Sequence, residues 1–141
     1  MKKLFIGALV SLFSVGFINA GSLQASENYT SVIIDCSQLG LSKTMAPVVV
    51  NDKGDELYPG AAGATMDMKA VLDGTIVSYE KDLNKARINK TAGNNPLIIK
   101  ASAVKGILSS DPMLSRLDSI RLALANNEAK FLVKRKVIFI Y

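Results

Sequence analysis

Few side chains in this sequence have the types and spacing that catalysis requires. The 141 residues include no histidine and a single cysteine, which excludes the arrangements in which an imidazole activates a serine or cysteine nucleophile. Most catalytic zinc sites also depend on histidine ligands and are excluded for the same reason. Any reactive group must therefore come from a lysine, a carboxylate, a hydroxyl or Cys36.

Serine and cysteine are poor candidates for a nucleophile here. Ser102 and Lys105 are close enough in sequence to form a Ser–Lys pair, but no serine lies in a Gly-x-Ser-x-Gly motif. No cation is adjacent to Cys36 in the sequence, and a reactive thiol needs such a neighbour to stabilise its thiolate. The apolar run around Cys36 favours a small core residue. We therefore predict that the protein is not an enzyme and carries no cofactor.

Two loops have compositions that occur in ligand sites. Asp52, Asp55 and Glu56 lie in one turn, where three carboxylates can attract calcium, but their spacing lacks the EF-hand order. The segment 59–64 is rich in Gly and Ala and can approach an anion, but no Lys-Ser/Thr pair follows it as in a P-loop. We interpret both segments as solvated or flexible loops and predict no metal site.

The amino-terminal residues have the pattern of a secretory signal peptide. Two lysines precede an uncharged apolar run from Leu4 to Ile18, which is shorter than the roughly 20 residues of a membrane-spanning helix. We predict cleavage after Ala20, with Ala25 as a second site, and an uncleaved membrane anchor is the alternative. Because Cys36 lies well beyond the apolar run, no lipobox is present and lipidation is not predicted. The expected location is the periplasm or the cell envelope.

Cleavage leaves one domain whose charge is unevenly distributed. We predict a removed segment 1–20, a flexible lead 21–29 and a single domain 30–141. The sequence has 17 Lys and Arg and 12 Asp and Glu, and cleavage removes two of the lysines. The net positive charge that remains is too small to indicate nucleic-acid binding. Residues 21–80 carry three Lys against eight acids, and residues 81–141 carry twelve Lys and Arg against four acids. The two halves either pack side by side or form a bipolar surface that favours head-to-tail association.

Runs of β-branched residues separated by turn signals predict an α+β fold. The expected strands are 30–36, 45–50, 56–58, 75–79, 96–101 and 131–141. The expected helices are 66–72, 80–87 and 111–126. We predict a mixed, largely antiparallel sheet of about five or six strands, with two or three helices packed mainly on one face.

The strongest helical pattern is 111–126. Pro112 suits the first position of a helix, and apolar side chains then recur at spacings of four, three and four. These are Met113, Leu117, Ile120 and Leu124. We expect this row to face the core, and the helix to cross between two parallel strands.

Several phrases of this sequence together resemble a family of small exported bacterial proteins. They are Val32-Ile33-Ile34-Asp35 with Leu39-Gly40, Met45-Ala46-Pro47-Val48 with Gly54 and Tyr58, and Gly74 and Tyr79 followed by Gly93-Asn94-Asn95-Pro96-Leu97-Ile98-Ile99-Lys100-Ala101. In that family the phrases read "VIIDARGLG…MSP…GREVYG" and "GxNPLVIKA". Cys36 stands where the family usually has alanine. The family is similar to small envelope lipoproteins, including one that builds the flagellar basal disk.

The resemblance implies a structural role in envelope assembly. We therefore expect an exported, non-enzymatic protein that supports an assembly, such as a flagellar or secretion apparatus, through self-association or docking. A periplasmic module for a small ligand, using segment 59–64 and two tyrosines, is the alternative function. The candidate structural or interaction residues are Asp35, Gly40, Pro47, Gly54, Tyr58, Gly74, Tyr79, Asn95, Pro96 and Lys100.

Two charged features extend this prediction. Asp35 and Lys100 end two apolar strands and are expected to meet as an ion pair, which would serve specificity more than stability. Lys134, Arg135 and Lys136 precede the last apolar strand and are candidates for peripheral contact with anionic lipid headgroups.

Overall fold

A computed structural model describes residues 28–60, 68–73 and 76–141. The predicted signal peptide and its two cleavage positions lie outside the described residues, as do Gly74 and most of the segment 59–64.

The first sheet is parallel throughout. In spatial order its strands are β4 (Ser78–Glu80), β8 (Val137–Ile140), β1 (Ser31–Asp35) and β5 (Pro96–Lys100). In the centre, Ile33 stands opposite Ile98 on one side and Ile138 on the other. Continuous apolar runs are typical of parallel strands that are covered on both faces, and all four residues of β8 are buried.

The second sheet is short and mixed. In spatial order its strands are β3 (Glu56–Tyr58), β2 (Val49–Val50), β7 (Asp111–Met113) and β6 (Ala103–Lys105). The outer pairs, β2 with β3 and β6 with β7, are antiparallel hairpins, and β2 pairs with β7 in parallel. The Asp111 carboxylate strengthens this junction by accepting a hydrogen bond from the Val48 N–H at 3.0 Å.

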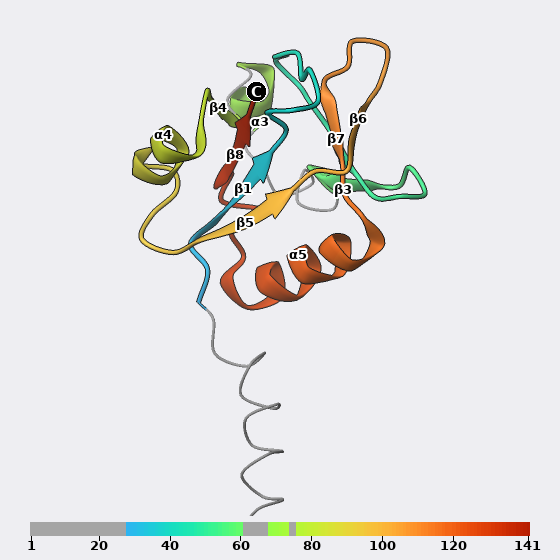
Figure 1. Cartoon of the computed structure of the whole chain (residues 1–141). Helices are drawn as coiled ribbons and strands as arrows, with labels where there is room; N and C mark the ends of the chain where they lie inside the picture. The colour runs from blue at the N-terminus through green and yellow to red at the C-terminus, as the bar shows by residue number, and fades with distance from the viewer. Residues whose placement is uncertain (1–27, 61–67, 74–75) are drawn as a thin grey trace, which may run out of the picture.

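The two faces of the first sheet are covered by different elements. Val32, Ile34 and Phe139 belong to the larger apolar core, which includes Leu122 of helix α5 (Arg116–Ala129) and Tyr58 of the second sheet. On the other face, Ile33, Ile138 and Ile140 pack with Ala86 of helix α4 (Leu83–Ile88) and with Ala92. Figure 1 shows α4 on the left of the first sheet, β6 and β7 on its right, and α5 below.

Two parts of the predicted fold class are wrong. The first sheet has no antiparallel pair, because β1 receives both of its neighbours, β5 and β8, through long connections that return the chain to the same edge. The helices also do not share one face, because α4 and α5 belong to the two separate cores. The described chain has eight strands in two sheets, and the α+β class itself is supported.

The long helix begins later than predicted. Pro112 lies within β7 and pairs with Val104, so it does not start the helix. Ser115 is the N-cap, and its hydroxyl accepts a hydrogen bond from the Asp118 N–H at 3.1 Å. The predicted parallel relation of the flanking strands is confirmed, since β5 and β8 both run parallel to β1, which lies between them.

The helix α5 also presents a different face from the one predicted. Leu122 is buried, and Ala125 and Ala129 are packed against the same core. Three residues of the row predicted to be buried are exposed instead: Leu117 is 68% exposed, Ile120 47% and Leu124 66%. The fourth, Met113, is half-buried in β7 and lies outside the helix. Large apolar residues occur on both sides of this helix, so periodicity alone cannot show which side meets the sheet.

The two shorter helices lie close to their predicted positions. Helix α3 (Met68–Leu72) is followed by Asp73, whose carboxylate forms an ion pair with Lys69 at 2.7 Å. Asp82 caps α4 by accepting a hydrogen bond from the Lys85 N–H at 2.8 Å.

Candidate functional site

Asp35 and Lys100 lie at the carboxyl edge of the first sheet, at paired positions of β1 and β5. The predicted ion pair between them is absent from the interactions of the described residues. The Asp35 carboxylate instead accepts a hydrogen bond from the Ser37 N–H at 2.9 Å, and Lys100 is exposed. The carboxylate therefore shapes the turn that follows β1.

Tyr79 joins the same edge to the loop after β1. Its hydroxyl donates to the Thr44 carbonyl at 3.1 Å, and its ring stands edge-on to Phe139 with centroids 5.7 Å apart. A second edge-on contact, at 6.2 Å, links it to Tyr141. Edge-to-face pairs of this kind stabilise beyond their buried area, so Tyr79 has a structural role here.

Tyr58 is a core residue. Its ring is fully buried, and its hydroxyl donates to the Ile76 carbonyl. Burial raises the pKa of Tyr58 well above its usual range, because the phenolate would lose its hydration, and the nearby Arg135 opposes this only in part. Since both the ring and the hydroxyl are used inside the fold, the described residues do not support Tyr58 as part of a small-ligand pocket.

The candidate nucleophiles also have structural surroundings. Burial raises the pKa of the Cys36 thiol to about 12, and the neighbouring Asp35 carboxylate adds to the shift. Cys36 is fully buried, so its thiol is protonated and inaccessible at neutral pH. The Ser102 hydroxyl donates to the Met113 carbonyl at 3.0 Å, which makes it part of the link between β5 and β7.

Asn95 and Pro96 form the entrance to β5. The Asn95 N–H donates to the Thr30 hydroxyl at 3.0 Å, and the Thr30 N–H donates to the Asn95 carbonyl at 2.9 Å. Pro96 stands opposite Ser31, where β1 begins. These residues therefore fasten the amino ends of the two strands to each other.

The remaining motif residues shape turns. Pro47 is buried at the entrance to β2. Gly40 and Gly54 have φ values of 70° and 87°, which L side chains rarely adopt. The structure thus distributes the predicted motif over several turns and strand ends and does not gather it into one site.

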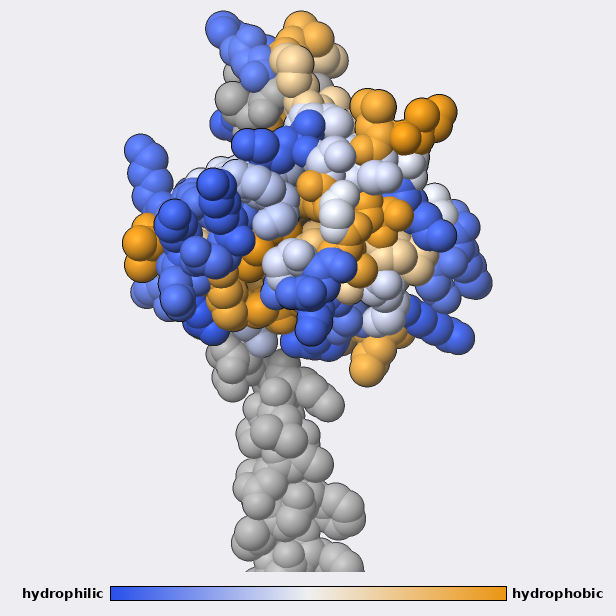
Figure 2. Space-filling view, turned by 45° about the horizontal axis from the view of Figure 1, so that its top comes forward, coloured by the Kyte–Doolittle hydropathy of each residue, from blue (hydrophilic) through white to orange (hydrophobic). Residues whose placement is uncertain are grey.

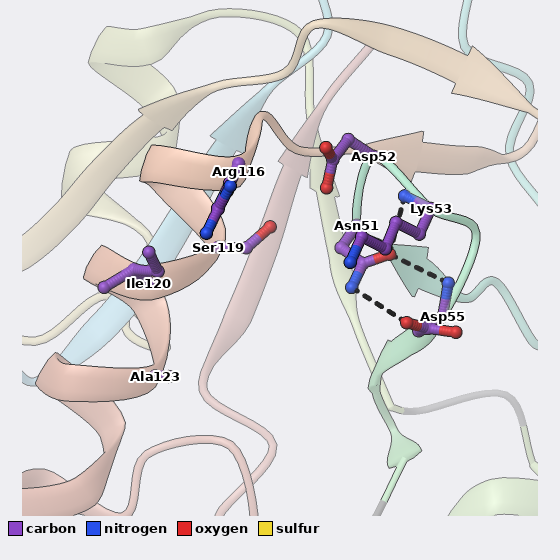
Figure 3. A pocket seen from close by; sticks show the side chains of 8 residues that line it. All are labelled: Asn51, Asp52, Lys53, Asp55, Arg116, Ser119, Ile120 and Ala123. Atoms are coloured by element: carbon purple, nitrogen blue, oxygen red, sulfur yellow. Dashed lines mark hydrogen bonds between the residues drawn. The ribbon is translucent and has the colours of Figure 1, made fainter.

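An open groove lies between the β2–β3 turn and α5 (Figure 3). Its volume is about 270 Å³, and its lining residues are Asn51, Asp52, Lys53, Asp55, Arg116, Ser119, Ile120 and Ala123. The Asn51 amide orders the turn, because its oxygen accepts hydrogen bonds from the Lys53 and Asp55 N–H groups, both at 2.9 Å. No group of three or more potential metal ligands occurs among residues 28–60, 68–73 and 76–141.

The outer row of α5, defined as Leu117, Ile120 and Leu124, runs beside this groove. Ile120 belongs to both features. The three side chains follow one another at spacings of three and four, which places them on one side of the helix. Isolated exposed leucines need no explanation, but an aligned row of large apolar side chains indicates a contact surface.

A separate group of basic residues lies on another part of the surface. Lys85, Arg87 and Lys90 are exposed in and after α4, next to Ile88, which is 84% exposed. This basic region covers the face of the first sheet opposite α5. The arrangement is compatible with the predicted bipolar surface, and head-to-tail association stays a prediction.

The predicted headgroup cluster is divided. Lys134 is exposed, whereas Arg135 and Lys136 are half-buried. Lys134 and Lys136 border a second groove, of about 490 Å³, which Tyr29 and Thr91 also line. Peripheral membrane contact through these three residues stays a prediction.

The fold defines a small α+β domain in which a parallel sheet packs against α5 and a second, mixed sheet. Residues 31–141 match the family described as the second domain of Treponema pallidum Tp0624, and the chain belongs to this family. A search of curated proteins found no match. The family match supports the resemblance to a bacterial protein family, but it provides no link to flagellar basal-disk lipoproteins. None of the described helices is both long and apolar enough to cross a bilayer.

Proposed function

We propose that this protein is a non-enzymatic module of the bacterial cell envelope that acts in an assembly by associating with copies of itself. The observation that carries the proposal is the outer row of α5, three large apolar side chains that are 47–68% exposed. Leaving such side chains in water is costly, and burying them between two proteins recovers about 25 cal/mol per Å² of apolar surface.

A second copy is the partner favoured by the two charges that lie in line with the row, four residues before Ile120 and four after Leu124. Arg116 lies near the amino end of the row, and Glu128 lies beyond its carboxyl end; both are exposed. When two α5 helices pack antiparallel, each amino end meets the other copy's carboxyl end, so opposite charges approach each other. The helix dipoles are also opposed in this arrangement. The resulting contact is isologous and closes as a dimer.

The size of the row sets the expected strength. A helix of 14 residues is about 21 Å long, and its side can supply only part of the roughly 800 Å² per partner that stable complexes bury. The β2–β3 turn, which lies across the groove from α5, extends the rim of the contact. We therefore expect a weak, concentration-dependent dimer, suited to an assembly in which many weak contacts act together.

Size-exclusion chromatography with light scattering tests this proposal. The wild-type protein is expected to show a mass that rises with concentration toward that of a dimer. Leu117→Glu with Leu124→Glu should hold it as a monomer, because the substitution places four charges in the paired row. Ile88→Glu is the matched control, since Ile88 is also an exposed apolar residue on a helix.

Two results would count against the contact. A wild-type protein that stays monomeric at high concentration and low salt would refute self-association. Larger species that respond to Ile88→Glu and not to the α5 variant would show head-to-tail association through the basic region instead. Circular dichroism of each variant checks that the fold is retained.

The proposed location in the cell envelope rests on the amino-terminal sequence. The basic start, apolar run and Ala20 indicate export, and the resemblance suggests a flagellar or secretion assembly. Mass spectrometry of the protein from an envelope fraction should find an amino terminus at residue 21 or 26. Recovery from the cytosol with Met1 intact would contradict export.

A further inference from the structure

The turn between β6 and β7 carries two large apolar side chains that are exposed to solvent. Ile107 is fully exposed, and Leu108 is 65% exposed. We call these two residues the apolar tip. Figure 1 shows this hairpin projecting from the upper right of the molecule, and Figure 2, in which that end comes forward, shows hydrophobic residues protruding there.

The backbone holds the tip in its outward position. Gly106 has a φ of 89°, and a Cβ there would lie 2.6 Å from the Asp111 carboxylate. The Ser109 N–H donates to the Gly106 carbonyl at 3.1 Å, which closes the turn. The exposure of the tip is therefore a property of a hydrogen-bonded turn, and it is not a consequence of an unstructured loop.

The loop 36–48 widens the apolar surface. Its Ser42 N–H donates to the Ser109 carbonyl at 2.9 Å, which fixes the loop against the turn. The loop contributes Met45, which is 63% exposed, and Leu39, which is 36% exposed. Two separate segments thus present large apolar side chains at the same end of the molecule.

Two lysines lie beside this apolar surface, and one of them, Lys105, stands opposite Asp111 of β7. Segments 36–48 and 102–110 contain Lys43 and Lys105 and no acidic residue. The nearest carboxylates in sequence are engaged by backbone groups, since Asp35 accepts from Ser37 and Asp111 accepts from Val48. An apolar protrusion flanked by ammonium groups is complementary to a bilayer surface, with acyl chains below anionic headgroups.

From this geometry we propose that the apolar tip and the adjoining loop 36–48 dock onto a lipid surface that carries anionic headgroups. Ile107 and Leu108 enter the boundary between headgroups and acyl chains, and Lys43 and Lys105 remain among the phosphates. This site is separate from the outer row of α5. It also differs from the Lys134–Lys136 cluster, which lies in the chain segment that leads into the amino end of β8.

Vesicle flotation with the full chain tests the proposal. The vesicles are phosphatidylcholine alone or phosphatidylcholine with phosphatidylglycerol, and each variant is compared with the wild type so that any contribution of residues 1–27 is constant. Ile107→Ser with Leu108→Ser should lower the partition coefficient for anionic vesicles by about tenfold or more, because two large apolar side chains are lost. Ile88→Ser, another exposed isoleucine, should leave it unchanged.

A fluorescent probe locates the contact directly. The sequence contains no tryptophan, so Ile107→Trp introduces a single reporter at the tip. Its emission should shift to the blue on addition of anionic vesicles and be quenched by brominated acyl chains. Added salt should weaken binding, because it screens the lysines.

Three outcomes would overturn the proposal. The tip is not the contact if the Ile107→Ser, Leu108→Ser variant floats as well as the wild type. Loss of flotation in Lys134→Glu, Lys136→Glu with the tip variant unaffected would assign binding to the other cluster. A blue shift that depends on protein concentration without vesicles would show that the tip packs against a protein.

Discussion

The two faces of the first sheet are buried in different ways. Toward α5 and the second sheet, the sheet presents Val32, Ile34 and Phe139 to a core that contains Tyr58 and other large side chains. Toward α4, the partners of its isoleucines include small alanines. The small side chains allow α4 to lie close to the sheet, so this face is closed with little added volume. The extra layer on the first face supplies both proposed interaction surfaces.

The largest loss of stability is expected when either of two neighbouring residues of β8, which point to opposite faces of the sheet, is replaced by alanine. Phe139 and Ile138 are both fully buried. Phe139→Ala should lower the free energy of unfolding by about 3–5 kcal/mol, and Ile138→Ala by about 2–4 kcal/mol, because Phe139 is the larger side chain and the alanines around Ile138 leave less volume to lose. Urea denaturation measures both. A larger cost for Ile138→Ala than for Phe139→Ala would contradict the contrast between the two faces.

Two glycines with positive φ allow backbone strain to be compared with and without a steric clash. A Cβ at Gly93, where φ is 70°, would lie 2.7 Å from Thr30, whereas Gly54 has a φ of 87° and nothing within 4 Å. Gly93→Ala should cost about 2–3 kcal/mol from backbone strain and the clash, and Gly54→Ala about 1 kcal/mol from strain alone. Thermal unfolding of the two variants distinguishes these contributions. Similar losses would mean that Thr30 moves aside freely.

The hydroxyl of Tyr58 tests how far the larger core depends on a polar group. Tyr58→Phe keeps the ring but removes the donor to the Ile76 carbonyl, which leaves a buried acceptor without that partner. The expected loss is about 1–2 kcal/mol, measured by urea denaturation. A variant as stable as the wild type would show that water or another donor replaces the hydroxyl.

The smallest effect on stability is expected on the outer side of α5. Leu117→Ser removes a side chain that is 68% exposed and should change the free energy of unfolding by no more than about 0.5 kcal/mol. Leu122→Ala, on the inner side of the same helix, should cost about 2–5 kcal/mol. If Leu117→Ser is strongly destabilising at low protein concentration, the row is not a free surface of the monomer.

The buried strands were predictable because local pattern and tertiary environment agree. The β-branched run in β1 and the apolar run in β8 suit strands that are covered on both sides. β1 lies where the sequence predicts it, but only the last part of the predicted strand 131–141 forms β8, because residues 131–135 form a turn. Strand order was not predictable in this way. Whether β1 pairs with β5 in parallel depends on connections of tens of residues, which leave no periodic signal in either strand.

The side of α5 that faces the core could not be predicted from the local sequence. The spacing of Leu117, Ile120 and Leu124 is typical of a buried stripe, yet Leu122 with Ala125 and Ala129 faces the core. The alanines at spacings of three and four were the available signal, because small residues permit close packing of a helix on a sheet. Similarly, Pro112 is compatible with the first turn of a helix and with strand β7. Only its pairing with Val104 shows that it belongs to the strand.

The sequence predicted the local roles of single motif residues, but it did not predict a site at which they come together. Gly40, Gly54, Pro47, Asn95 and Pro96 lie at the turns and strand entrances that their conformational preferences indicate. The features that carry the present proposals, the outer row and the apolar tip, required the structure. Exposure is a property of the whole fold, and the residues themselves are ordinary core types.

The interior position of β8 has a consequence for how the chain acquires its structure. Val137–Ile140 lie between β4 and β1, so the sheet cannot be completed before this late segment has emerged. Contacts between residues so distant in sequence slow folding, and until they form β1 keeps an unsatisfied edge. If the protein is exported as proposed, this delay would help to keep the chain unfolded during translocation, because an interior strand of the sheet is among the last segments to cross the membrane.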